Sequence, residues 1–221
     1  NMTSNFTILD SDDVGTLIKK IIKEKGYDPK QVTPSFVKNK ISFIKNEMLS
    51  NSEAEKLLNT DMDKIAYQIY IEYNTKLRKN NSVDFDDLLK LPVELFRNNP
   101  SILEHYQDKF KYILIDEYQD TNEVQYQLVK LLAAKYQNLF VVGDPDQSIY
   151  QFRGANYQNI LNFEHDYKNT EVIALEDNYR STKMILDAAN SVIKNNSERK
   201  EKNLRSHHGD GVKIKYMRGY N

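Results

Sequence analysis

The sequence predicts an α/β protein in which an all-helical first part precedes part of a parallel sheet. Two short runs of aromatic and β-branched residues, at 112–115 and 139–142, have the composition of buried strands in such a sheet. Between them, residues 122–136 have the apolar spacing of a helix, which Asn122 and Gln125 would cap together. Strand, helix and strand in this length form a βαβ unit, so we expect the two strands to lie parallel and close together in one sheet.

The first third of the chain differs in kind, because between residues 10 and 80 all the signals are helical. A first helix is expected over 11–26, and a second begins at Thr33-Pro34, with threonine as N-cap and proline at the first helical position. Ser52 with Glu55 predicts the capping box of a third helix. The last helix has an apolar residue at every fourth position: Ile65, Ile69, Tyr73 and Leu77. We expect a small helical subdomain, and its residues alone are those of an ordinary packing module.

Acidic residues follow both predicted strands. Asp116 and Glu117 come directly after the first strand, and Asp144 follows the second. Ligands of open α/β sheets bind at the carboxyl ends of the strands. Two neighbouring acids there can divide the work of nucleotide hydrolysis, with Asp116 holding Mg²⁺ through its water shell and Glu117 deprotonating the attacking water. The pair alone fits a strand followed by an acidic helix cap equally well.

A third unit of the same kind follows. Residues 171–175 predict a strand, residues 176–182 a polar turn, and a helix should run from about Ser181 to Asn195. Its apolar side would carry five residues: Met184, Ile185, Ala188, Ala189 and Val192.

Three segments together resemble motor motifs of the UvrD/Rep/PcrA-type superfamily 1 DNA helicases, and within that family the PcrA branch. They read DEYQDTN at 116–122, VVGDPDQSIYQFRGA at 141–155 and LEDNYRST at 175–182. They stand in the order that the family has, and together they are very specific. Flanking segments resemble it too: NFTILD at 5–10, VDFDDLL at 83–89 and AANSVIKNNSERK at 188–200. The resemblance covers essentially the whole chain.

The resemblance implies a fold and a division into domains. The fold would be a partial P-loop NTPase (RecA-like) parallel sheet with an N-terminal all-helical subdomain. Residues 1–84 would be the helical subdomain inserted in the first motor domain, where such helicases contact DNA. Residues 85–168 would be the C-terminal part of the first motor domain, and residues 169–221 the start of the second.

The resemblance also implies a nucleotide site for ATP and Mg²⁺. Gln147 would sense the γ-phosphate, which on the residues alone is more simply a structural loop glutamine. Tyr179 would pack on the adenine ring, and Arg180 would reach the γ-phosphate from the second motor domain, where an arginine suits the charge of the transferring phosphoryl group. Asp177 departs from the family, which usually has glutamine before Asn178.

The same resemblance implies contacts with DNA. Tyr150, Phe152 and Arg153 match the base-stacking part of the second motif, and Phe85 matches an aromatic residue that contacts DNA. Aromatic rings and a guanidinium plane can support unstacked bases at about 1–3 kcal/mol per base. On the residues alone, the two aromatic rings are more simply core, with Arg153 paired to a carboxylate. Phe85 is then an anchor of the helix that follows it.

The phosphate-binding loop of such motors, G-x-x-x-x-G-K-[ST], is absent, because none of the seven glycines is followed by lysine. We therefore expect an internal segment of a larger ATP-dependent 3′–5′ DNA helicase, which couples ATP hydrolysis to translocation on single-stranded DNA and to duplex unwinding. Its partners would be single-stranded and duplex DNA and the remainder of the parent helicase. The segment alone should be inactive. The alternative is a noncatalytic DNA- or protein-binding module that keeps a motor-like fold.

Composition limits the classes of protein to which the chain can belong. The 221 residues carry a net charge of −1, so a global basic field does not attract nucleic acid, although a local groove still can. With no cysteine there is no disulfide framework and no thiolate metal site. The sequence has no apolar run of the length that a membrane helix needs, and no signal peptide. We expect a cytoplasmic protein with no membrane partner.

Overall fold

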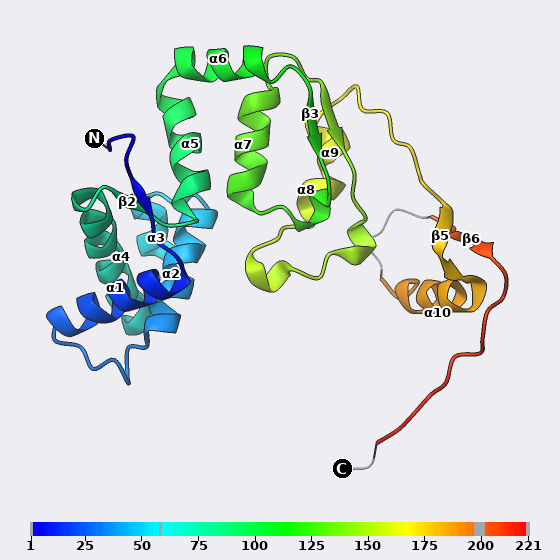
Figure 1. Cartoon of the computed structure of the whole chain (residues 1–221), viewed down its shortest axis with the longest axis horizontal. Coiled ribbons are helices and arrows are strands. Elements are labelled where there is room, and N and C mark those ends of the chain that lie inside the picture. Colours follow the sequence, from blue (N-terminus) through cyan, green and yellow to red (C-terminus); the bar gives the residue numbers. More distant parts are fainter. Residues whose placement is uncertain (1, 58, 197–201, 220–221) are drawn as a thin grey trace.

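The computed structural model describes residues 2–57, 59–196 and 202–219, and it contains the two kinds of structure that the sequence predicts (Figure 1). The helical part comprises α1 (Ser11–Glu24), α2 (Pro34–Asn46), α3 (Asn51–Leu57) and α4 (Asp61–Lys79). A short parallel strand pair, β1 (Thr7–Ile8) with β2 (Ser82–Val83), joins its two ends. Helices α1, α2 and α4 pack on one another around a core of buried isoleucine, valine and tyrosine side chains.

The caps of these helices follow the local sequence, with one correction. Thr33 caps α2 and Pro34 occupies its first turn, as predicted. The predicted capping box of Ser52 with Glu55 is wrong. In α3 the side chain of Ser50 accepts a hydrogen bond from the Glu53 N–H (3.3 Å), and the Glu53 carboxylate accepts one from the Ser50 N–H (2.9 Å). Both pairs have the required spacing, and because the helix begins one residue after Ser50, that serine is the N-cap.

A buried ionic cluster ties α2 to the start of α5 (Asp87–Asn98). The Lys45 ammonium lies 2.7 Å from Asp84 Oδ2 and 2.8 Å from Asp87 Oδ1, with all three side chains buried. The Tyr73 hydroxyl of α4 donates to the same Asp84 oxygen at 2.8 Å. Burial raises the pKa of the Tyr73 hydroxyl, and the Asp84 charge adds to that effect. Burial also raises the pKa of the Asp87 carboxyl, against the opposing influence of Lys45.

The α/β part is built on two parallel strands, β3 (Ile113–Ile115) and β4 (Leu139–Val141). Their register places Ile113 opposite Leu139 and Ile115 opposite Val141, so the predicted pairing is confirmed. Helix α7 (Glu123–Ala133) connects them, capped as predicted by Asn122 and Gln125. Helices α5 and α6 (Pro100–Lys109) pack on α7, and Figure 1 shows the strand pair on the side of α7 away from α5.

The prediction that these strands are buried is only half right. Leu114 is 73% exposed and Phe140 59% exposed, although both lie in the paired segments. The two residues are paired across the ladder, so they share one face of the sheet. Within the part of the chain that the structure describes, this face is not covered by another element.

The C-terminal unit corrects the predicted third strand. Residues 171–175 form no strand, and Val172, Ile173 and Leu175 are exposed. The strand is instead β5 (Asp177–Thr182), in the predicted turn, and it pairs in parallel with β6 (Arg205–His208). An extended apolar run becomes a strand only where a neighbour can pair with its backbone, and β6 begins its hydrogen bonds at the Glu176 carbonyl, which accepts from the Arg205 N–H at 2.8 Å.

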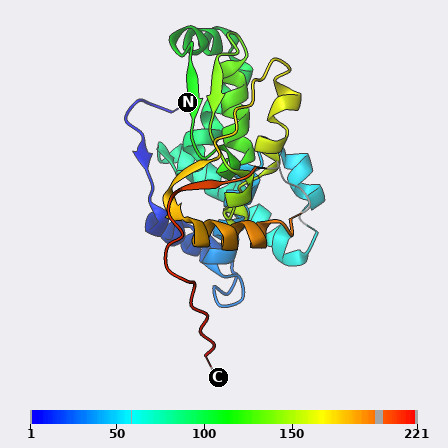
Figure 2. The ribbon, with the colours of Figure 1, turned by 90° about the vertical axis from the view of Figure 1, so that its right-hand side faces the viewer.

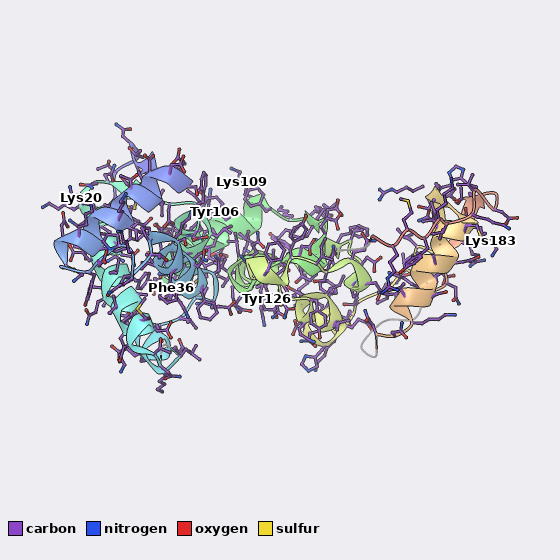
Figure 3. All side chains as sticks on the ribbon, turned by 90° about the horizontal axis from the view of Figure 1, so that it is seen from below. Lys20, Phe36, Tyr106, Lys109, Tyr126 and Lys183 are labelled. Carbon is purple, nitrogen blue, oxygen red and sulfur yellow. The ribbon has the colours of Figure 1, made fainter. Side chains whose placement is uncertain are left out.

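The helix of this unit, α10 (Lys183–Ile193), lies within the predicted range and packs on β5 and β6. Its predicted apolar side is largely in water, because Ile185 and Val192 are exposed, and Leu186 is the buried residue. Figure 3 shows this unit, marked by Lys183, at the opposite end of the molecule from α1, marked by Lys20. After β6 the chain leads away from the other elements (Figure 2).

The remaining short elements lie between β3 and the C-terminal unit. They are the 3₁₀ turns η1 (Tyr118–Asp120), η2 (Pro145–Gln147) and η3 (Gln151–Arg153), and the helices α8 (Gln158–Leu161) and α9 (Phe163–Asp166). Helix α8 packs against η1. No helix among the described residues combines the length and apolarity of a transmembrane span.

Replacing Lys45 with methionine should destabilise the protein strongly. The change leaves Asp84 and Asp87 buried without their counter-charge, which costs about 3–5 kcal/mol when one partner of a buried pair is removed. Urea unfolding of residues 1–221, followed by the helical circular dichroism signal, measures the loss.

The matched control is Lys64→Met, because the ammonium of Lys64 lies 3.5 Å from Asp61 on the exposed side of α4. It should change the free energy of unfolding by less than about 0.5 kcal/mol. Equal unfolding midpoints for the two variants would show that the buried carboxylates do not depend on Lys45.

Candidate functional site

The candidate site lies at the carboxyl ends of β3 and β4. Backbone hydrogen bonds continue beyond the paired segments, from the Val142 N–H to the Ile115 carbonyl (2.8 Å) and from the Tyr118 N–H to the Val142 carbonyl (2.9 Å). The two loops that leave the strands are therefore held against each other. As predicted, the first loop carries Asp116 and Glu117 and the second carries Asp144.

Glu117 has an unusual backbone. Its φ is 50° and its ψ 43°, in the left-handed region that costs a residue with a side chain about 1–2 kcal/mol. The Glu117 N–H donates to Asp116 Oδ1 at 2.9 Å, so the Asp116 carboxylate is held against the backbone of Glu117. Both side chains are exposed at the strand edge.

Gln119 is a site residue that the sequence analysis missed. Its side chain is buried, and its Nε2 donates to Glu117 Oε2 at 2.7 Å. Its Oε1 accepts from the Asp144 N–H at 3.0 Å, which joins the two loops. The Ser148 hydroxyl donates to the Gln119 carbonyl at 3.4 Å. An amide flanked by three carboxylates in sequence is the one signal that could have identified it.

The second loop is organised around Asp144. Its Oδ1 accepts from the Asp146 N–H (3.0 Å) and caps η2, and its Oδ2 accepts from Gln147 Nε2 (2.8 Å). Lys202, from the C-terminal unit, pairs with Asp144 and lies 3.2 Å from Asp146 Oδ2. Burial alone would raise the pKa of Asp144, but Lys202 and Gln147 outweigh it and hold that pKa below its ordinary value. Sequence reasoning missed Lys202, since nothing local marks it.

The second loop continues into the predicted aromatic segment. Tyr150 and Phe152 lie with their ring centroids 6.1 Å apart, and Phe152 is 79% exposed. The interpretation of Phe152 as a core residue is therefore wrong. Arg153 is the last residue of η3, and Gly154, with a φ of 87°, caps the turn after it.

Phe85 belongs to a different part of the molecule, between β2 and α5, and it is 60% exposed. It does not anchor the apolar side of α5, which was the alternative. The loop that carries it is nevertheless connected to the first strand end, because Asn46 of α2 donates to Asp86 (3.1 Å) and accepts from Asn122 (3.0 Å).

Tyr179 and Arg180 lie in β5 and are exposed. The Tyr179 ring stacks on His207, with centroids 4.4 Å apart and an interplanar angle of 18°. His207 in turn lies 3.1 Å from Asp177 Oδ1. Among the described residues, no hydrogen bond or ion pair connects Tyr179 or Arg180 with Glu117 or Gln147. The structure thus brings Asp116, Glu117 and Gln147 to one edge, and leaves the β5 pair apart from them.

Two family models match the chain. One is described as the UvrD/REP helicase N-terminal domain and matches residues 1–168, and the other as the UvrD-like helicase C-terminal domain and matches residues 173–221.

Curated relatives share about half of the aligned residues. The chain is 54% identical over 217 residues to ATP-dependent DNA helicase PcrA of Bacillus subtilis (strain 168), which covers 98% of this chain and 29% of that protein. It is 50% identical over 212 residues to the proteins of the same name from Staphylococcus aureus (strain Mu50) and Staphylococcus epidermidis, covering 96% of this chain and 29% of each relative. The chain thus spans less than a third of the length of these relatives.

Replacing Gly143 with alanine should disturb the contact between the two loops. A Cβ there would lie 2.6 Å from Gln119 Oε1 and 3.2 Å from the Tyr118 nitrogen, so the Gln119 amide must leave its position or the loops must separate. Overpacking of this kind costs about 1–3 kcal/mol. Hydrogen exchange should show less protection of the Asp144 amide, and urea unfolding a lower stability.

Gly15→Ala is the control, because the added Cβ meets no atom within 4 Å in the interior of α1. It should stabilise the chain by about 0.5–1 kcal/mol. Unchanged protection of the Asp144 amide in Gly143→Ala would contradict the close approach of the two loops.

Proposed function

The chain belongs to the UvrD/REP helicase family, and we propose that it is a segment of an ATP-dependent DNA helicase. Its α/β architecture is the RecA-like P-loop type of that family, with an N-terminal helical part. The helicase would couple ATP hydrolysis to 3′–5′ translocation on single-stranded DNA and to duplex unwinding. One observation carries the proposal: Glu117 and Gln147 follow two paired parallel strands at the same carboxyl edge, where open α/β sheets bind their ligands, and they are connected there through Gln119 and Asp144.

The proposed domains follow the elements. Residues 1–84 would form the helical subdomain of the first motor domain, and residues 85–168 the C-terminal part of that domain. Residues 169–221 would begin the second motor domain. The limits of the two family models, at residue 168 and residue 173, support the second boundary.

Asp116 would hold Mg²⁺ on the bound nucleotide. Its Oδ1 accepts from the Glu117 N–H, and its Oδ2 has no hydrogen-bond partner among the described residues. Mg²⁺ is usually held by one or two carboxylates together with waters and substrate phosphates, so an exposed carboxylate at a strand end fits it. When bound, the ion would neutralise negative charge that develops on the phosphate oxygens.

Glu117 would accept the proton of the attacking water, and Gln147 would orient toward the γ-phosphate. The left-handed backbone of Glu117 supports this, because such strained conformations concentrate at functional sites. Tyr179 would stack on the adenine ring with the ring face that His207 does not cover. Arg180 would reach the γ-phosphate when the two motor domains close, where its charge stabilises the transferring phosphoryl group.

DNA would lie on the exposed aromatic residues. Phe152 and Tyr150 offer ring faces on which successive bases can stack, with Arg153 on the same short turn. Phe85 would contact DNA from the loop between β2 and α5, beside the helical subdomain. Gln147 and Phe152 are separated by four residues, so a shift of the phosphate sensor would reach the bases through a short stretch of backbone.

DNA-stimulated ATPase measurements test the activity. Residues 1–221 alone should show no turnover, because they contain no phosphate-binding loop and positioning dominates phosphoryl transfer. The complete helicase, meaning the longer chain that the proposal requires, should turn over ATP. In it, Glu117→Gln should retain ATP binding and lower kcat by about 10²–10⁴-fold, the contribution of a general base.

Glu171→Gln, an exposed carboxylate outside the site, is the control and should behave like wild type. Wild-type turnover by Glu117→Gln would remove Glu117 as the base. Turnover by the 221-residue chain alone would contradict the role of the missing loop.

Two substitutions on the second loop should give distinct phenotypes in the complete helicase. Phe152→Ala should weaken single-stranded DNA binding by about 5- to 150-fold, the loss of one stacked base, with DNA-free ATPase nearly unchanged. Gln147→Ala should leave nucleotide-free DNA affinity unchanged and uncouple hydrolysis from strand separation. DNA affinity, basal ATPase and unwinding are measured on both variants.

Phe152→Trp, which keeps an aromatic face, should retain DNA binding. If Phe152→Ala instead abolished solubility together with basal ATPase, the ring would be a packing residue. If Gln147→Ala unwound DNA as wild type does, its coupling role would be refuted.

A further inference from the structure

Gln119 connects the proposed base with the proposed phosphate sensor. Its side chain is 1% exposed, yet both of its polar atoms are hydrogen-bonded to residues of the site edge. We propose that Gln119 is a positioning residue that holds the Glu117 carboxylate for attack on the nucleotide and ties it to the loop of Asp144 and Gln147. The inference rests on the proposed function.

The hydrogen bonds form one continuous chain. Glu117 Oε2 accepts from Gln119 Nε2 (2.7 Å), and Gln119 Oε1 accepts from the Asp144 N–H (3.0 Å). Asp144 Oδ2 then accepts from Gln147 Nε2 (2.8 Å). Four residues from two loops therefore form a single hydrogen-bonded path from the base to the sensor, and Gln119 is the only link between the loops in that path.

The orientation of the Gln119 amide follows from its partners. A backbone N–H can only donate, so the amide oxygen faces Asp144. An ionised carboxylate can only accept, so the amide nitrogen faces Glu117. A side chain at this position needs one donor and one acceptor at a fixed separation. Methionine has a similar length and offers neither, and glutamate offers only acceptors.

The Glu117 carboxylate needs a hydrogen-bond partner to fix its position. Its side chain is exposed at the edge and its backbone is in the left-handed region, so packing does not fix its carboxylate. A free glutamate side chain rotates among several staggered conformations, few of which point at an attacking water. Misplacement of a reacting group by about 1 Å can lower a rate by about 10²-fold. A hydrogen bond from a buried amide removes most of that freedom.

Gly143 supports the same arrangement from the second loop. A side chain there would collide with Gln119 Oε1, so the amide reaches Asp144 only because residue 143 is glycine. The Ser148 hydroxyl also contacts the Gln119 carbonyl at 3.4 Å. The second loop thus holds Gln119 in place through Asp144 and Ser148, and Gln119 in turn holds the Glu117 carboxylate. A displacement of either loop would therefore move that carboxylate.

Steady-state ATPase of the complete helicase, at saturating single-stranded DNA, tests the role. Gln119→Met should lower kcat by about 10- to 100-fold with KM for ATP nearly unchanged. Gln119→Glu keeps an acceptor for the Asp144 N–H but adds a negative charge beside Glu117. It should lower kcat, and the acid limb of its kcat–pH profile should move to higher pH.

Gln107→Met is the matched control. Gln107 is also a buried glutamine, and its Nε2 donates to the Leu131 carbonyl at 2.8 Å, away from the strand edge. This variant should lose stability without a change in kcat. A merely structural role of Gln119 would instead give the two methionine variants the same kinetic profile.

A double mutant shows whether Gln119 acts through Glu117. Adding Gln119→Met to Glu117→Gln should slow turnover no further, because the positioned group is already gone. Additive losses would overturn the proposal, as would wild-type kcat in folded Gln119→Met. If Gln119→Met does not fold, an unchanged kcat and pH profile in Gln119→Glu would overturn it. Wild-type turnover by Glu117→Gln would instead refute the proposed function itself.

Discussion

The parallel pairing of β3 and β4 is the constraint on which the whole site depends. Because Ile115 lies opposite Val141, both strands end at one edge and their loops emerge side by side. The acids after β3 and Asp144 after β4 therefore lie at the same edge, where the Gln119 side chain connects Glu117 with the Asp144 N–H. A shift of register by one residue would turn every strand side chain to the other face, and the two strand-end loops would no longer be aligned. Close contact then needs one further condition, the absence of a side chain at Gly143.

A second constraint is electrostatic and lies on α2. Lys45 neutralises two buried carboxylates at the start of α5, and the next residue, Asn46, bonds to both Asp86 and Asn122. One turn of α2 thus fixes the loop of Phe85 and the N-cap of α7 together. Buried charges of this kind add little net stability compared with apolar packing, but their geometry is demanding. The helical part is consequently held in a defined orientation to the first strand end.

Local signals predicted most of the elements, and long-range contacts account for what they missed. The caps at Thr33-Pro34 and Asn122 depend on residues three or fewer positions apart, so the sequence contains the whole interaction. The prediction of a strand at 171–175 was wrong because strand formation depends on a pairing partner, and β6 pairs with the residues that follow this run. The location of Asp116, Glu117 and Gln147 at the strand ends could be predicted, because each follows a strand that the sequence marks. Lys202 could not, because its contact with Asp144 joins residues 58 apart. For Gln119 the neighbouring carboxylates were the local signal, but its bond with the Asp144 N–H joins residues 25 apart and is not visible in the sequence.

The uncovered face of the β3–β4 pair also bears on the tendency of the isolated chain to aggregate in solution. Leu114 and Phe140 present apolar surface on a sheet of two strands, and no further strand pairs with either outer edge in the part of the chain that the structure describes. Such surfaces pair with copies of themselves, which is the usual route to aggregation. A net charge of −1 provides almost no repulsion to oppose this. We therefore expect residues 1–221 to have low colloidal stability near neutral pH, and light scattering would give the concentration up to which the chain stays monomeric.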